Sequence, residues 1–141
     1  IERALNLIKP GGRLSIVLPQ GVLNNTNMQY IRQFLFDKAR ILAVVGLDVN
    51  TFKPHTGTKT SVLFLQKWKE KEKPLEDYSI FMAVSKKSGK DSSGDYIYKK
   101  DADRNFVYDA KGRRVLDHDL DQIAEEFIKF AKEQNLDFWR G

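Results

Sequence analysis

Three short apolar runs constrain the fold of this chain more than any other feature of its sequence. They lie at residues 13–18, 41–47 and 60–66. Runs of this length, rich in branched apolar side chains, are typical of β-strands. The first run is almost continuously apolar, which predicts a strand that is buried on both faces of a parallel sheet.

Helical patterns lie before the first run and between the first two. Residues 2–8 carry apolar side chains on one face, and the Pro-Gly-Gly segment at 10–12 predicts the end of that helix. The asparagine-rich residues 24–27 offer N-caps for a helix at about residues 28–38. Strands and helices alternate, so we expect an α/β sheet with helices on its faces. The side chains expected to face the core from the second helix are Met28, Ile31, Phe34 and Leu35.

The second half of the chain has a different character. An alternating-charge linker at residues 68–74 is followed by a strand candidate at 78–84. Residues 85–114 are polar and rich in turn residues, which predicts a loop or weak hairpin, and they show no evident internal repeat. A closing helix is expected at residues 120–134, with Asp119 and Gln122 forming a capping box at its start. The aromatic pair Phe138 and Trp139 predicts that this end docks onto another domain or copy.

Composition narrows the class of protein. The chain has 141 residues, of which 41% are hydrophobic, and it has no cysteine and two histidines. Disulfide frameworks, iron–sulfur clusters and thiolate zinc sites are excluded, and an all-protein transition-metal site is not expected. No apolar run approaches the roughly twenty residues that span a bilayer, so we expect a cytoplasmic protein. The start at Ile1 is neither an initiator methionine nor a signal peptide, so we expect a piece of a longer chain.

The net charge of +5 is unevenly distributed. Residues 1–66 hold eight basic and three acidic residues, whereas residues 67–141 hold sixteen of each. A basic first half attracts polyanions such as nucleic acid, although an ordinary solvated surface has the same composition. Within the polar segment, lysines 86, 87, 90, 99 and 100 could contact DNA or a partner subunit. Nearby aspartates offset them, so a solvated segment is the preferred interpretation.

Two loops follow predicted strands at the end where α/β sheets bind ligands. The first, at residues 19–25, carries the amides of Gln20, Asn24 and Asn25, which could hydrogen-bond a base or phosphate or could cap the next helix. Capping is the commoner role for a single asparagine.

The second loop, at residues 52–60, combines Phe52 with Lys53, Thr58 and Lys59. This mixture suits a phosphate and a stacked base. The spacing of a phosphate-binding P-loop is not met. An ordinary hairpin connection whose Phe52 packs inward is an equally good interpretation.

The order of several segments resembles the second half of the catalytic domain of adenine-specific DNA methyltransferases, and most closely the modification subunit of type I restriction-modification systems. The segments are LIKPGGRLSIVLP at 7–19, IRQFL at 31–35, FKPHTGTKTSVLFL at 52–65, IFMA at 80–83 and DHDLDQIAEEFIKF at 117–130.

The resemblance implies the second half of a Rossmann-like sheet that uses S-adenosylmethionine and ends in a β-hairpin, followed by a loop or hairpin extension and a C-terminal helix. The first apolar run would be the fifth strand, and the other two would form the hairpin. The division would fall between residues 1–67 and 68–141. The target adenine would be flipped out of the duplex, because its amine is otherwise stacked and paired. Phe52 would stack on it, while Lys53 and Lys59 would hold phosphates.

The departures from the family are equally informative. The chain has no Gly-x-Gly cofactor motif and no Asn/Asp-Pro-Pro-aromatic catalytic motif, both of which lie upstream in the family. We therefore expect no catalytic and no cofactor-binding residue in this chain, and no methyl transfer by it alone. Its expected partners are DNA, the upstream part of the polypeptide, and the specificity and restriction subunits. The alternative is a non-catalytic nucleic-acid or protein-interaction module; methylation of RNA or protein rests on the fold alone.

Overall fold

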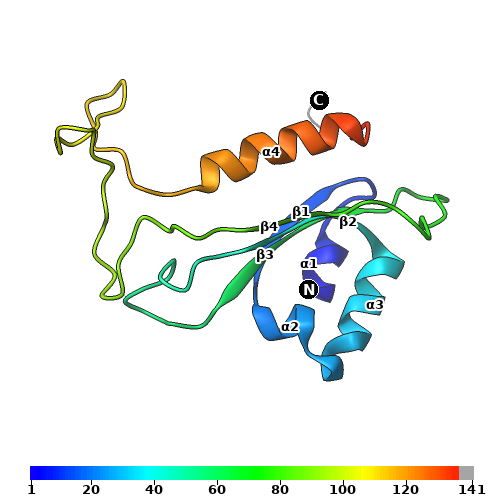
Figure 1. Cartoon of the computed structure of the whole chain (residues 1–141). Helices are drawn as coiled ribbons and strands as arrows, with labels where there is room; N and C mark the ends of the chain where they lie inside the picture. The colour runs from blue at the N-terminus through cyan, green and yellow to red at the C-terminus, as the bar shows by residue number, and fades with distance from the viewer. Residues whose placement is uncertain (137–141) are drawn as a thin grey trace.

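The computed structural model describes residues 1–136 and consists of three layers (Figure 1). Helices α1, α2 and α3 cover one face of a four-stranded sheet, and α4 crosses the other face. In chain order the elements are α1 (Glu2–Leu7), β1 (Arg13–Pro19), α2 (Gln20–Asn24), the 3-10 turn η1 (Thr26–Met28), α3 (Gln29–Lys38), β2 (Ala39–Gly46), β3 (Thr60–Lys67), β4 (Phe81–Val84) and α4 (Leu120–Glu133).

The sheet is mixed, with strand order β1-β3-β2-β4. β3 is antiparallel to both of its neighbours, and β4 lies parallel to β2. The expected hairpin between the second and third apolar runs is therefore confirmed. β1 and β2 point the same way because each is antiparallel to β3.

The prediction that the first apolar run is buried on both faces is wrong for this sheet. Among residues 1–136, β1 pairs with β3 alone, and its residues alternate between exposed and partly buried, with Leu18 alone fully buried. Leu14, Ile16 and Leu18 pack toward α1–α3, whereas Val17 points away and is exposed. A continuous apolar run shows only that polar residues are few; it does not show that both faces are covered.

Each face of the sheet has its own hydrophobic core. The larger core packs the α1–α3 layer against the sheet, and Leu35, Leu63 and Leu65 are its largest completely buried side chains. Burying a leucine side chain contributes about 1.5 to 3 kcal/mol. The smaller core packs Leu42 and Phe64 of the sheet against the C-terminal half of α4. The three predicted helices are confirmed; α2 is an addition.

The asparagine-rich segment does not cap α3 as expected. Met28 is the N-cap residue of α3, and no side chain makes a capping hydrogen bond there or at η1. The chain instead enters α3 through η1, whose own intrahelical bonds satisfy the first N–H groups. The amides of Asn24 and Asn25 consequently remain exposed.

The predicted strand at 78–84 begins only at Phe81, because Tyr78 has another role. The backbone N–H of Ile41 donates to the Tyr78 hydroxyl over 3.0 Å, next to a register shift in β2 between Ile41 and Ala43. Burial raises the pKa of Tyr78, although this hydrogen bond and the nearby Arg40 oppose the shift. The tyrosine thus satisfies a strand N–H where the β-ladder is irregular.

The segment expected to be a loop or weak hairpin folds into three successive short hairpins, which we call the three-hairpin unit (residues 86–118). The pairs that close them are Lys90 with Tyr96, Lys100 with Phe106, and Tyr108 with Arg114. Further bridges from Ser88 to His118 and from Tyr98 to Leu116 tie the hairpins together.

The hairpins share one turn design, so the expectation of no internal repeat is wrong. Asp91, Asp101 and Asp109 each open a turn, and one carboxylate oxygen of each accepts hydrogen bonds from backbone N–H groups two and four residues later. The residue three positions after each aspartate has a positive φ: it is Gly94, Arg104 or Gly112. The repeat was hidden because only the aspartate is shared by all three copies.

The expected capping box at α4 is also wrong. The Asp119 side chain makes no capping hydrogen bond. Its carboxylate instead accepts hydrogen bonds from the Ser85 hydroxyl at 2.6 Å and from the Lys86 N–H at 2.7 Å. Burial opposes ionisation, but these bonds outweigh it and lower the pKa of Asp119. Asp119 therefore joins the end of β4 to the start of α4. The expected docking of Phe138 and Trp139 lies outside the described residues.

Candidate nucleic-acid interface

The two loops singled out from the sequence lie at the same edge of the sheet. β1, β2 and β4 all run in one direction, so the segments after them leave the sheet together. The backbone N–H of Gln20 donates to the carbonyl of Lys59 over 3.0 Å, which joins the start of the first loop to the end of the second. The structure therefore brings Gln20 and Lys59 together, as the shared strand direction requires.

The loop between β2 and β3 is held by its own hydrogen bonds. The Asp48 carboxylate accepts from the N–H of Asn50 at 2.9 Å, and the Thr51 hydroxyl donates to the Asp48 carbonyl at 2.7 Å. Near the other end, the Thr56 hydroxyl lies 3.0 Å from both the N–H and the hydroxyl of Thr58. A loop ordered in this way can present its side chains in fixed directions.

Phe52 does not pack into the core. Its residue surface is 37% exposed, so the alternative of an inward-packed hairpin connection is not supported. Lys59 is exposed in the same loop, and Lys53 is partly buried. In the described part of the chain neither lysine forms an ion pair. The loop thus offers an aromatic ring and two cations.

Asn24 and Asn25 stand apart from this group. Both are exposed, and among the described residues no side-chain hydrogen bond is recorded for either amide. The Arg32 guanidinium donates to the carbonyls of Asn25 at 2.8 Å and Val22 at 3.5 Å, and so fixes the backbone of the first loop. Within residues 1–136, no hydrogen bond links these two asparagines to the second loop.

The sequence did not reveal that the three-hairpin unit supports the second loop. The Lys90 ammonium donates to the carbonyl of Lys53 over 2.9 Å, and the Ser88 hydroxyl donates to the Asp48 carboxylate over 2.9 Å. Gly94 fits directly against the loop: a Cβ there would lie 2.6 Å from the Pro54 nitrogen. The glycine marks a turn in the sequence, but its contact partner is forty residues away.

A separate apolar cavity of about 480 Å³ lies between the sheet and the N-terminal half of α4. Phe64, Phe81 and Phe127 contribute to its walls, and Thr51 is the polar residue among those lining it. Its chemistry suits an apolar group and does not match the polar loops. Within residues 1–136 no helix is long and apolar enough to cross a membrane, and no cluster of three or more metal-ligating side chains occurs.

These features define a mixed α/β domain with a basic and aromatic loop at the carboxyl edge of its sheet. The profile of the N-6 DNA Methylase family matches residues 1–139, and the chain belongs to that family. It is 29% identical over 68 residues to the type I restriction enzyme EcoEI methylase subunit of Escherichia coli. That alignment covers 48% of this chain and 14% of the relative, so the chain spans a small part of the relative's length.

Solved structures show a similar pattern of partial coverage. A putative class I S-adenosylmethionine-dependent methyltransferase from Listeria monocytogenes matches with a TM-score of 0.49 and 23% identity, over 59% of this chain and 24% of that one. A structure of a type I R-M system matches 88% of this chain and 20% of its own, with a TM-score of 0.43 and 20% identity. A modification subunit of a putative type I restriction enzyme from Vibrio vulnificus gives a TM-score of 0.39 at 17% identity, covering 77% and 28%.

Proposed function

We propose that this chain is part of an adenine-specific DNA methyltransferase of a restriction-modification system, which transfers a methyl group from S-adenosylmethionine to the exocyclic amine of adenine. The observation that carries the proposal is membership of the N-6 DNA Methylase family over residues 1–139. The exposed aromatic ring and the two lysines of the 52–59 loop support it, since they suit a nucleic-acid substrate and neither lysine forms an ion pair within residues 1–136.

On this proposal the 52–59 loop receives the flipped adenine. Phe52 stacks on the base, an interaction worth about 1 to 3 kcal/mol. Lys53 and Lys59 neutralise phosphates, and the Thr58 hydroxyl is a further hydrogen-bonding group beside them. The amides of Gln20, Asn24 and Asn25, in the segment after β1, can bind base edges or phosphates.

Cofactor binding is assigned to residues outside this chain. A methyl donor bound at a sheet edge needs a turn that lets the backbone approach it. β1 ends at Pro19 and runs directly into α2, where a Cβ on Gly21 would meet the Asn25 amide at 3.2 Å, and β2 ends at Gly46, where a Cβ would meet Val84 at 3.7 Å. These residues do not fit S-adenosylmethionine. We therefore place no catalytic residue in this chain and derive no step through the cofactor.

The same proposal fixes the expected partners. The chain would act in the cytoplasm with DNA, with the upstream part of its own polypeptide, and with specificity and restriction subunits. Residues 1–67 would form the methyltransferase-like half, and residues 68–141 the family-specific extension. In the structure the extension adds β4 to the sheet and lays α4 across it.

The test replaces Phe52 by alanine in the complete modification enzyme and measures transfer of labelled methyl groups to duplex DNA. Loss of the stacked base should lower the rate about tenfold or more, since 1.4 kcal/mol corresponds to a factor of ten. Tyr30→Ala removes an aromatic ring on α3 that is 69% exposed, and it should leave the rate unchanged. An unaltered rate in Phe52→Ala would remove that role, and no adenine methylation by the complete enzyme would overturn the function.

The competing interpretation is a non-catalytic nucleic-acid or protein-interaction module derived from the same fold. The sequence that encodes the residues before Ile1 separates the two. A glycine-rich motif and an Asn/Asp-Pro-Pro-aromatic motif there support the enzyme, and their absence supports the module. The 141-residue chain by itself should not methylate DNA, and robust transfer by it would contradict our assignment of the cofactor site.

A further inference from the structure

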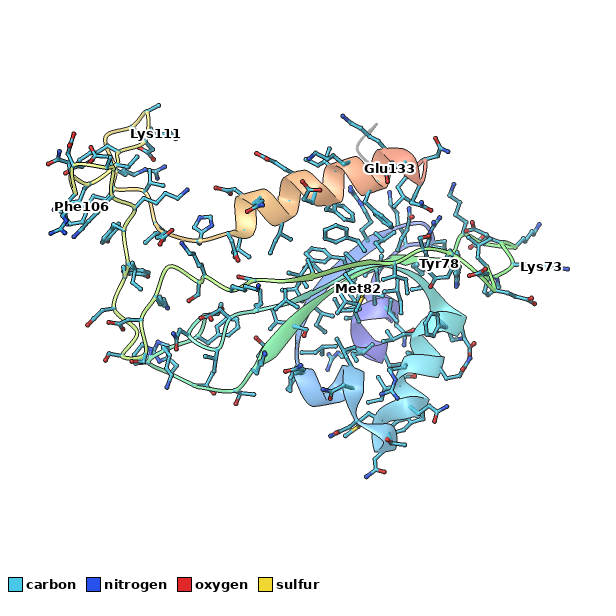
Figure 2. All side chains as sticks on the ribbon, viewed as in Figure 1. Lys73, Tyr78, Met82, Phe106, Lys111 and Glu133 are labelled. Carbon is cyan, nitrogen blue, oxygen red and sulfur yellow. The ribbon has the colours of Figure 1, made fainter. Side chains whose placement is uncertain are left out.

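The three-hairpin unit has a net positive charge, although the second half of the sequence as a whole is neutral. Residues 86–118 contain nine basic and six acidic residues, whereas residues 119–136 contain two basic and five acidic residues. The unit projects from the carboxyl edge of the sheet, and Figure 2 shows Phe106 and Lys111 at its far end. The two opposite charges therefore lie on separate parts of the molecule.

Half of the unit's carboxylates face their own turns. Asp91, Asp101 and Asp109 accept backbone hydrogen bonds at 2.8 to 3.0 Å. The N–H groups of Asp95 and Arg113 hold the pKa of Asp91 and of Asp109 below their usual range. A carboxylate satisfied by N–H dipoles repels a nearby anion less than a free one does. These three aspartates therefore reduce the attraction of the lysines for an anion less than their number suggests.

Three cations of the unit lie over aromatic rings. The Arg114 guanidinium is 4.2 Å from the centroid of Phe106, and the Lys100 ammonium is 5.3 Å from the same centroid. Lys90 lies 5.5 Å from the Tyr96 centroid. In the described part of the chain, none of these three cations forms an ion pair. An aromatic face orients a cation but does not cancel its charge, so the N–H groups remain available to an anion.

This surface is continuous with the 52–59 loop. Lys90 binds the Lys53 carbonyl, and Gly94 lies against the backbone of Lys53 and Pro54. The first hairpin therefore joins the cations of the unit to those of the loop. A polyanion as long as a DNA duplex, with one charge per about 1.7 Å of its axis, can contact both at once.

We propose that the three-hairpin unit is a second DNA-contacting surface, in which Lys100 and Arg114 bind backbone phosphates of the duplex whose target base lies at the 52–59 loop. The choice of duplex DNA as the polyanion rests on the proposed function. Because phosphates carry no sequence information, this contact is independent of the recognition sequence.

The test compares two variants of the full chain that lose the same charge. Lys100→Gln with Arg114→Gln removes two cations of the unit, and Lys71→Gln with Lys73→Gln removes two from the linker at the opposite end of the molecule, where Figure 2 labels Lys73. Fluorescence anisotropy gives the Kd for two short labelled duplexes of unrelated sequence at several salt concentrations. Each lost phosphate contact should reduce the slope of log K against log salt by about 0.9.

We expect the unit variant to lose about 2 from that slope and to bind both duplexes more weakly by the same factor. The linker variant should keep the wild-type slope. Lys100→Gln alone should lower the slope by about 1, and Lys100→Arg should keep the wild-type slope because it keeps the charge. This pair of variants separates charge from packing, which is needed because Lys100 and Arg114 both lie over the Phe106 ring. Thermal melting of each variant checks that the fold is retained.

The proposal is overturned if the wild-type chain does not bind the duplex at low salt, or if the slope is unchanged in the unit variant. It is also overturned if the linker variant loses as much slope as the unit variant, or if poly-glutamate displaces the labelled duplex as well as unlabelled duplex does. An unchanged slope beside normal adenine methylation by the complete enzyme would remove this contact and leave the proposed function intact. A reduced slope in the unit variant, together with no adenine methylation by the complete enzyme, would support this contact and overturn the proposed function.

Discussion

The sheet with its helices and the three-hairpin unit are stabilised in different ways. Both hydrophobic cores lie at the sheet, where leucines such as Leu35, Leu63 and Leu65 are completely buried. The three-hairpin unit contributes no residue to either core, and Tyr96, Ile97 and Tyr108 are exposed there. Turn hydrogen bonds and cation–aromatic contacts hold the unit together instead. The comparison shows that one short chain can combine a region built by burial with one built by local polar geometry.

The largest expected effect tests the part built by burial. Leu63→Ala removes a side chain that is 0% exposed at the centre of the sheet, and it should lower the free energy of unfolding by about 2 to 5 kcal/mol. The matched change in the unit, Ile97→Ala, removes a half-exposed side chain and should cost less than about 1.5 kcal/mol. Denaturant unfolding measures both values. Equal losses would contradict the distinction between the two regions.

A smaller effect is expected where the two regions meet. Gly94→Ala introduces a Cβ at a φ of +98° and within 2.8 Å of the backbone of Lys53 and Pro54, so it should cost about 2 to 3 kcal/mol and loosen the 52–59 loop. Gly112→Ala meets no atom within 4 Å and should cost about 1 kcal/mol, from its φ of +72° alone. Hydrogen exchange of the loop amides should accelerate only in the first variant. Acceleration in both would mean that the contact at Gly94 is unimportant.

The smallest expected effect concerns the link between β4 and α4. The pKa of Asp119 is lower in the folded protein than its ordinary value of 3.8. The ionised carboxylate therefore contributes its full share to the free energy of unfolding above the ordinary pKa, and this contribution is lost as the pH falls through the lowered pKa of the folded protein. Asp119→Asn should cost about 1 to 2 kcal/mol at neutral pH and should make the stability fall less steeply on acidification. Urea unfolding between pH 7 and pH 2 measures this, and parallel curves for the two proteins would contradict the role of the carboxylate.

Most strands and helices could be predicted because their signals are local. The apolar runs at residues 41–47 and 60–66 became β2 and β3 within two residues of their expected bounds, and the helical patterns became α1, α3 and α4. The loop at 52–60 was also found correctly as a connection between strands. Hydrophobic periodicity depends only on which face of an element is buried, so it can be recognised without knowing which other element packs against that face.

The candidate site was predictable only in its composition. Its aromatic ring and lysines stand together in the sequence, but its support comes from Ser88, Lys90 and Gly94 in the three-hairpin unit. The same is true of Asp119. Its position before an apolar helix suggests a cap, but its partners are Ser85 and Lys86, which lie more than thirty residues earlier. Contacts across thirty or forty residues depend on the path of the chain, which local patterns do not contain.

Local sequence patterns were sufficient to predict most strands and helices, the basic first half, and the family resemblance, which the family match over residues 1–139 confirms. The position of β3 between β1 and β2, and the contact of the first hairpin with the loop between β2 and β3, become evident only from the three-dimensional arrangement. The physical reason is the range of the forces. Propensity and periodicity act within a few residues, whereas strand order and the exposure of a surface are set by which distant segments exclude water together.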